Sequence, residues 1–169
     1  MTLRLRPYQL NDEAAALAIH EAMLAENFHF LLYWNSSLTW TEFLAALDLQ
    51  RRGSNLAKDQ VRAVQLAAEV DGELVGRASI RFQLNDFLLM KGGHVGYGVA
   101  PAYRGRGYAS EILRQALVIL RADGVDRALV TCDDGNVASM RTIEGSGGVL
   151  ESIVPSNGND PPIRRYWFE

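Results

Sequence analysis

The sequence has little of several things that define common protein classes. Cys132 is its only cysteine, so no intrachain disulfide is possible, and a reducing compartment fits this usage. No apolar run approaches the ~18 residues that a membrane helix needs. Residues 1–6 alternate charged with apolar side chains and lack the apolar core of a secretory signal. Together these absences predict a cytoplasmic location and no membrane partner.

An excess of positive charge is also missing. Seventeen lysines and arginines stand against twenty acidic residues, which gives a formal net charge of −3. This balance argues against nucleic acid as the main partner. The histidine, cysteine and acidic residues show no metal-ligand spacing, so no metal is expected. What the chain does have is 169 residues, 48% of them apolar, which predicts one globular domain over residues 1–169.

Hydrophobic periodicity and turn residues predict the order of helices and strands. Asp71-Gly72, a dipeptide that type I′ turns prefer, lies between two alternating segments and predicts a hairpin. Residues 84–93 are expected to form a loop. A central hairpin followed by helical crossovers is typical of an α+β (mixed α/β) fold rather than a doubly wound parallel sheet. The predicted helices are 12–25, 39–50, 107–122 and 136–144, and the predicted strands are 2–6, 64–70, 73–82, 94–99, 129–132, 149–154 and 164–168.

The segment from Val99 to Ala109 has the features of a turn that binds a pyrophosphate. It links a predicted strand to a predicted helix. The first N–H groups of a helix are unpaired and carry partial positive charge, which suits a phosphate. Gly105 and Gly107 have no Cβ, so the backbone can approach an anion closely. Arg104 and Arg106 add permanent positive charge with planar hydrogen-bond donors.

Two other phosphate-binding motifs fit this segment poorly. No Gly-Lys-Ser/Thr sequence follows, so the turn is not a nucleoside triphosphate P-loop. The spacing of Gly105 and Gly107 resembles a dinucleotide fingerprint, but Ser110 replaces its third glycine. Asp126 precedes a predicted strand, where a ribose-binding acid would end one. The alternative is an arginine- and glycine-rich turn between strand and helix that binds no ligand.

Arg104-Gly105-Arg106-Gly107-Tyr108-Ala109 matches R/Q-x-x-G-x-G/A, the signature of the GNAT acetyltransferase superfamily, including a preceding Val-x-Pro. Asn136 with Ser139, just after a predicted strand, is similar to the family's second cofactor element. The predicted order of elements agrees with the family over almost the whole chain. Residues 84–85, 92–97 and 165–167 further resemble a bacterial subgroup. The resemblance implies a splayed mixed sheet of about six to seven strands flanked by about four helices.

The resemblance also implies a ligand and an activity. Acetyl-CoA would lie in a V between the fourth and fifth strands, predicted at 94–99 and 129–132. Backbone groups near Tyr97 and Val99 would pair with its pantetheine, and the amides of residues 105–109 would hold its pyrophosphate. The implied activity is acetyl transfer to a primary amine of a small molecule or peptide, by direct attack in a ternary complex. The expected cofactor-binding residues are Tyr97, Val99, Arg104, Gly105, Arg106, Gly107, Tyr108, Ala109, Asn136 and Ser139.

His94 is the candidate catalytic base. Many family members have a glutamate three residues before the aromatic that Tyr97 matches, and this chain has His94 there. A pKa near ~6.5 suits an imidazole that accepts an ammonium proton at neutral pH. By strand alternation His94 shares a face with Gly96 and Gly98, which leaves space beside it. A histidine that is merely hydrogen-bonded at a strand edge is the alternative.

The general acid is where the sequence departs from the family pattern. Many members carry a tyrosine about seven residues after the asparagine, and Ile143 occupies that position here. Tyr108 or Ser139 would be substitutes, or the thiolate leaves unprotonated. Cys132 is interpreted as a small buried apolar residue rather than a nucleophile. The missing tyrosine keeps open a second function, a non-catalytic acyl-CoA-binding sensor or scaffold.

Aromatic residues gather where the family places contacts to the acceptor. They lie between the first two predicted helices and are more typical of a core than of a site: Phe28, Phe30, Tyr33, Trp34 and Trp40. Family analogy also predicts a homodimer joined through the C-terminal strands. The identity of the acceptor amine is left open.

Overall fold

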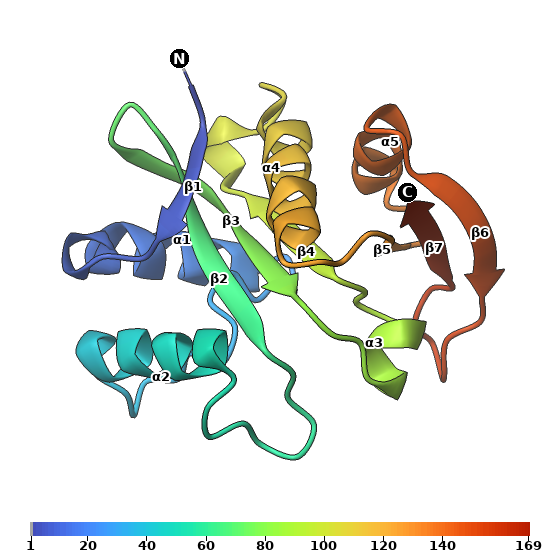
Figure 1. Ribbon diagram of the computed structural model, residues 1–169. Coiled ribbons are helices and arrows are strands. Elements are labelled where there is room, and N and C mark those ends of the chain that lie inside the picture. Colours follow the sequence, from blue (N-terminus) through green and yellow to red (C-terminus); the bar gives the residue numbers. More distant parts are fainter. Residues whose placement is uncertain (1) are drawn as a thin grey trace.

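Seven strands form two antiparallel sheets in the computed structural model, which describes residues 2–169 (Figure 1). The first sheet has the order β1-β2-β3-β4, and its strands are Arg4–Pro7, Ala63–Val70, Glu73–Arg81 and Val95–Val99. The second sheet has the order β5-β7-β6, with β5 at Ala128–Asp133, β6 at Val149–Val154 and β7 at Ile163–Phe168. The predicted α+β fold with six to seven strands is confirmed.

Five α-helices accompany the strands: α1 at Glu13–Leu24, α2 at Trp40–Arg52, α3 at Asp86–Met90, α4 at Tyr108–Ala122 and α5 at Val137–Gly145. Four of them match predicted helices. α3 corrects the predicted loop at 84–93, because Asn85 caps a short helix by accepting a hydrogen bond from the Leu88 N–H at 2.9 Å. A helix of five residues is too short to show a helical periodicity, so the pattern misses it.

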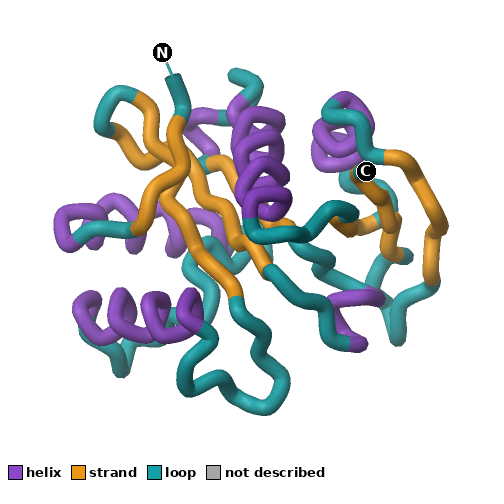
Figure 2. Tube along the Cα trace, viewed as in Figure 1, coloured by secondary structure: helices purple, strands orange, loops and turns teal. Residues whose placement is uncertain are grey.

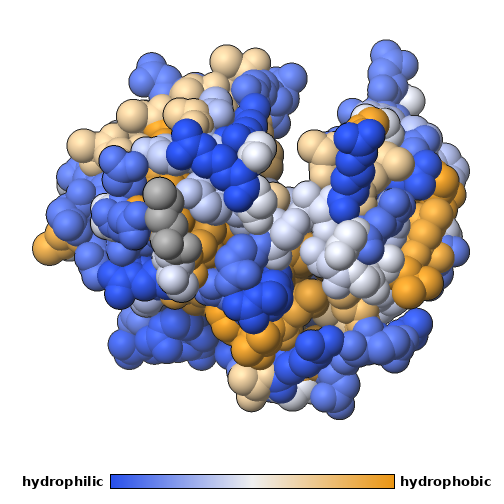
Figure 3. Space-filling view, turned by 90° about the horizontal axis from the view of Figure 1, so that it is seen from above, coloured by the Kyte–Doolittle hydropathy of each residue, from blue (hydrophilic) through white to orange (hydrophobic). Residues whose placement is uncertain are grey.

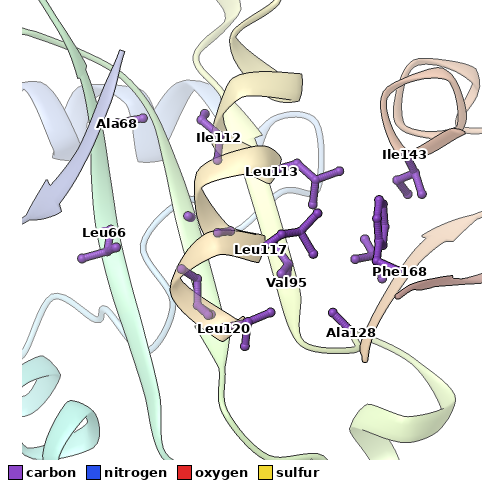
Figure 4. Close-up of a cluster of buried hydrophobic side chains, with 14 of the residues drawn as sticks. Leu66, Ala68, Val95, Ile112, Leu113, Leu117, Leu120, Ala128, Ile143 and Phe168 are labelled. Atoms are coloured by element: carbon purple, nitrogen blue, oxygen red, sulfur yellow. The ribbon is translucent and has the colours of Figure 1, made fainter. Parts of the chain in front are cut away.

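Both faces of the first sheet are covered by helices (Figure 2). α4 packs on one face, and α1 and α2 pack on the other. Figure 4 shows α4 side chains between the first sheet and the second, with Val95 on one side and Phe168 on the other. α4 therefore joins the cores of the two sheets. Within residues 2–169, no helix is long and apolar enough to cross a membrane.

The two sheets touch at one end and then diverge. His94, just before β4, donates its N–H to Leu129 O of β5 at 2.7 Å, and the Leu129 N–H donates to His94 Nδ1 at 2.9 Å. No ladder joins β4 to β5 in the part of the chain that the structure describes. β4 therefore has a free edge on the side of β5 and α5. The opening beside it corresponds to the predicted V.

Candidate active site

A cavity of about 540 Å³ lies between β4, the N-terminus of α4 and α5. Seen from above, the surface is hollowed between the part that carries α4 and the part that carries α5 (Figure 3). Most of the predicted cofactor-binding residues line this cavity, although they come from three separate segments: Tyr97, Val99, Arg104, Gly105, Gly107, Tyr108, Ala109, Asn136 and Ser139. Arg106 and His94 lie outside the lining.

The turn before α4 presents backbone rather than side chains to the cavity. Gly105 and Gly107 have φ values of 76° and 79°, a region that favours glycine. A Cβ at either position would have no atom within 4 Å, so the turn is open on that side. Gly107 is the N-cap of α4, a helix of 15 residues that begins with N–H groups lacking intrahelical partners. The cavity thus contains a helix N-terminus that an anion can approach freely.

The two arginines of the turn point in different directions. Arg104 Nη2 lies 2.6 Å from Glu26 Oε2, and Arg104 Nε donates to Val99 O at 3.2 Å. Arg106 instead stacks on Tyr103, with 5.5 Å between its guanidinium carbon and the ring centroid. The Val99 carbonyl, which is predicted to pair with the ligand, therefore already accepts one hydrogen bond from Arg104. A carbonyl oxygen has two lone pairs, so a ligand can share it with Arg104.

A pair of hydroxyl groups lies in the cavity wall. The Tyr97 hydroxyl is 2.8 Å from Ser139 Oγ, and this contact joins β4 to α5 across the opening. Asn136 caps α5 by accepting a hydrogen bond from the Ser139 N–H at 3.1 Å. Burial raises the pKa of Tyr97 to about 12, so its hydroxyl keeps its proton at neutral pH. The sequence predicts a role only for the backbone here, although strand alternation places this side chain on the face opposite the neighbouring glycines.

His94 is buried where the two sheets meet, with 6% of its surface exposed. Its Nδ1 accepts the Leu129 N–H, so the neutral ring carries its proton on Nε2. Burial lowers the pKa of His94, and the charge of Arg81 lowers it further. The base role of His94 stays a prediction, and this hydrogen bond sets a condition for it. The ring has a lone pair for an ammonium proton only after it releases Leu129.

Ile143 and Cys132 belong to the core. Ile143 has no exposed surface and lies beside Phe168 (Figure 4). Burial raises the pKa of the Cys132 thiol to about 11, which leaves it protonated and unreactive at neutral pH. Among residues 2–169, no group of three or more His, Cys, Asp or Glu side chains could hold a metal ion.

The aromatic residues between α1 and α2 divide between core and surface. Phe30 and Trp40 are buried, whereas Tyr33 is exposed and Trp34 is half-buried. Phe28 lines the cavity, where its ring covers Gly98: a Cβ at Gly98 would lie 2.6 Å from the tip of that ring. The core interpretation therefore fits Phe30 and Trp40, and the site interpretation fits Phe28.

One family model matches most of the sequence, that of the acetyltransferase (GNAT) domain, over residues 2–149. The chain belongs to the GNAT acetyltransferase family. The family predicted from the sequence is thereby confirmed. No curated protein matches the sequence.

Solved structures share this GNAT fold over most of their length. The yncA protein of Salmonella typhimurium, solved with its cofactor acetyl-CoA, is 17% identical, with a TM-score of 0.67 over 100% of this chain and 94% of that one. RimJ of Mycobacterium smegmatis, solved with CoA-disulfide, is 20% identical, with a TM-score of 0.73 over 98% and 81% of the two chains. An N-acetyltransferase from Staphylococcus aureus Mu50 is 17% identical, with a TM-score of 0.69 over 100% and 99%. At these identities the likeness shows the fold alone.

Proposed function

We propose that this GNAT protein transfers the acetyl group of acetyl-CoA to a primary amine of a small molecule or peptide, by direct attack in a ternary complex. Residues 1–169 act as a single catalytic domain in this proposal. The observation that carries it is the open glycine turn at the N-terminus of α4, which lines a cavity of about 540 Å³. The solved relatives that hold acetyl-CoA or CoA-disulfide support the choice of donor.

The residues of the cavity fit a coenzyme A ester. Backbone N–H groups after Gly105 and Gly107 suit a pyrophosphate, and Arg104 is the cation within reach. The free edge of β4 at Val99 offers backbone groups to the pantetheine in the manner of an added strand. When bound, acetyl-CoA supplies a thioester whose carbonyl carbon is attacked by the amine while the carbon–sulfur bond breaks.

Tyr97 donates a hydrogen bond to the leaving sulfur and keeps its own proton. Its pKa is raised by burial to about 12, whereas an ordinary thiol has a pKa near ~8.5, so full proton transfer from Tyr97 is unfavourable. Ser139 Oγ, 2.8 Å away, holds the hydroxyl in the cavity wall. Because Ile143 lies in the core at the family's usual tyrosine position, the hydroxyl comes from the facing strand instead.

In this proposal His94 is a hydrogen-bonded residue at the strand edge that positions β4 against β5. Its only free lone pair in the neutral state accepts the Leu129 N–H, so the amine gives its proton to water. The base role for His94 stays a prediction that requires the ring to release Leu129. The kcat of His94→Asn at pH 7 and at pH 9 distinguishes the two roles.

Gly107→Glu tests the donor site. A glutamate there puts bulk and negative charge at the proposed pyrophosphate position, so we expect calorimetry to show no acetyl-CoA binding. Gly124→Glu is the matched control, since Gly124 also has a positive φ, 89°, and no atom within 4 Å of a Cβ, but lies beyond the other end of α4. Both variants carry the same kind of backbone strain. Affinity that is unchanged in Gly107→Glu removes the turn as the donor site.

A non-catalytic acyl-CoA sensor or scaffold is the second candidate, because Ile143 replaces the family's tyrosine. Release of free CoA from acetyl-CoA in the presence of primary amines supports the transferase. Binding of acetyl-CoA without release supports the sensor.

The predicted homodimer also stays a proposal. β6 lies at the edge of the second sheet and exposes Val149, Leu150 and Ile153. Exposed apolar side chains on an edge strand support pairing with a second copy through the C-terminal strands.

A further inference from the structure

Two arginines converge beside β4, on the sheet face that α1 and α2 cover. Arg77 and Arg81 lie four residues apart on β3, so they point to the same face. A Cβ at Gly96 would lie 3.3 Å from Arg77 Nη1, and 3.6 and 3.7 Å from Nη1 and Nη2 of Arg81. Three guanidinium nitrogens therefore lie within 3.7 Å of the Cβ position that the glycine lacks.

Arg77 is buried, with 5% of its surface exposed, and most of its donors are unused. Its Nη2 donates to His29 O at 3.2 Å, while Nε and Nη1 have no hydrogen-bond partner within the described residues 2–169. Burial lowers the pKa of Arg77 to about 10, so the group is still charged at neutral pH. The Tyr8 hydroxyl is likewise buried without a partner. Buried cations and polar groups destabilise a fold unless an anion or a polar atom meets them.

Within residues 2–169, neither Arg77 nor Arg81 forms an ion pair with an acid. Asp12 and Glu69 both pair with Arg6. Asp59 lines the same small cavity of about 210 Å³ as Arg81, but across residues 2–169 no ion pair joins the two. Arg81 Nη1 donates only to the carbonyl oxygens of residues 92 and 93, at 3.2 and 3.4 Å. Neither converging guanidinium group is therefore paired with a carboxylate among the described residues.

One aromatic ring, that of Phe28, contacts both this cluster and the donor site. The guanidinium carbon of Arg77 lies 4.9 Å from the ring centroid of Phe28, and the same ring lines the cavity. Gly98, which pairs with Arg77 in the β3–β4 ladder, lines the cavity as well. Gly96 and Gly98 leave this face of β4 without side chains. A small molecule bound at the two arginines therefore lies next to the edge of β4 along which the donor is proposed to extend.

We propose that Arg77 and Arg81 bind a carboxylate of the acceptor, so that this enzyme acetylates a small amine that also carries a carboxylate, as free amino acids do. The inference rests on the proposed function, because it describes the acceptor of that same reaction. Converging guanidinium groups offer paired N–H donors that match the two oxygens of a carboxylate. An amide of the same amine has no negative charge and leaves both arginines without a counterion.

The first assay compares free L-amino acids with their C-terminal amides as acceptors, by release of CoA from acetyl-CoA. We expect at least one amino acid to be used with a kcat/KM at least ~10-fold above that of its amide. Arg77→Met should remove this preference, because it lowers kcat/KM for the acid by ~10-fold or more relative to that for the amide. Arg127→Met is the matched control, because Arg127 also stacks on an aromatic ring, that of Trp167, but is exposed and paired with Glu169.

The second assay measures thermal unfolding and does not depend on turnover. With CoA present, the free amino acid should raise the midpoint of the wild type and not that of Arg77→Met. Without ligand, Arg77→Met should itself unfold at a midpoint higher by ~3 °C or more, since a buried cation is replaced by an apolar side chain. A lower midpoint with an unchanged preference for the acid means that Arg77 only supports the fold, and overturns the proposal.

Gly96→Ala provides a second variant that leaves the arginines in place. Its backbone does not have a positive φ, and the added methyl would stand at the point where the guanidinium groups converge. We expect it to fold and to lose the preference for the acid. A variant that keeps the full preference shows that the carboxylate binds elsewhere and overturns the proposal.

The outcomes separate this inference from the proposed function. Equal use of amino acids and amides leaves an acetyltransferase and overturns the carboxylate site. If acetyl-CoA binds but no amine releases CoA, the proposed function fails. The thermal assay then tests the carboxylate site by itself. Stabilisation by the free amino acid that is lost in Arg77→Met supports the site, and no stabilisation of the wild type overturns it.

Discussion

Arg104 is held by the protein's own carboxylate: its Nη1 and Nη2 lie 3.1 and 2.6 Å from the two oxygens of Glu26. A pyrophosphate in the neighbouring turn would use the same donors, so Glu26 competes with it. Glu26→Gln should therefore tighten acetyl-CoA binding by about 2- to 5-fold, the range of an exposed ion pair, in a calorimetric titration. Asp48→Asn removes a comparably exposed acid from Arg51 and should change nothing. Weaker binding in Glu26→Gln would mean that Glu26 holds Arg104 in its binding position.

Single residues also show which parts of the site a sequence can predict. Gly105 and Gly107 are readable from the sequence as an open turn, and both have the positive φ that favours glycine. Arg104 and Arg106 are equivalent in the sequence, yet one pairs with Glu26 and the other stacks on a tyrosine. Side-chain direction depends on neighbours that are distant in sequence. Arg77 shows this most clearly, since strand pairing alone brings it beside β4.

At the scale of elements, strong local signals match the structure closely. Thr39 and Glu42 form a capping box at the start of α2, and Gly53 ends that helix in the left-handed region. The Asp71-Gly72 hairpin has the predicted turn. The split between the sheets has no local signal, because it depends on which distant strands pair. Family resemblance predicts the V, and in the structure the two sheets meet at the contact of His94 with Leu129.

Gly76 tests how closely β3 and β4 must approach to shape the edge of the donor cavity. A Cβ there would lie 2.5 Å from Gly98 O and 3.1 Å from Ile112 Cδ1, so the backbone of β4 must shift. Gly76→Ala should lower the free energy of unfolding by about 1–3 kcal/mol and weaken acetyl-CoA binding. Gly145→Ala in α5 is the control, since its Cβ would meet no atom within 4 Å and its φ is not positive; urea unfolding should show no loss. Unchanged stability of Gly76→Ala would contradict the tight β3–β4 approach.

At the scale of the whole molecule, two buried histidines join distant segments in their neutral form. His20 Nδ1 accepts the Leu31 N–H at 3.0 Å, and His94 Nδ1 accepts the Leu129 N–H at 2.9 Å. Burial is the main cause that lowers the pKa of both rings below 6.5. The unfolded chain takes up protons near pH 6.5 that the folded chain resists. Stability is therefore complete above about pH 6.5 and falls as the pH drops below it.

Carboxylates cause a second loss of folding stability, at a lower pH. A hydrogen bond from Arg6 holds the pKa of Glu69 below its usual 4.5. Burial would raise the pKa of Asp12, but hydrogen bonds from Arg6 and the Gln9 N–H outweigh it and hold that pKa below 3.8. The stabilisation by these groups is present above the unfolded values and lost as the pH falls through the folded ones. Urea unfolding should show a plateau above about pH 6.5, one decline below it and another below about pH 4.5. A free energy of unfolding that stays constant down to pH 5 would contradict the predicted contribution of the two histidines.

His94→Asn separates the two roles of that histidine in the same experiment. The asparagine oxygen can accept the Leu129 N–H but does not titrate, so the decline below about pH 6.5 should shrink while stability at higher pH is kept. His20→Asn should also reduce the decline in stability below about pH 6.5, by the part that His20 contributes. This variant does not alter β4. If His94 only joins the sheets, His94→Asn changes kcat by one common factor at pH 7 and pH 9. A larger loss at pH 7 would identify His94 as the base, and the ring would then have to release Leu129 in each turnover.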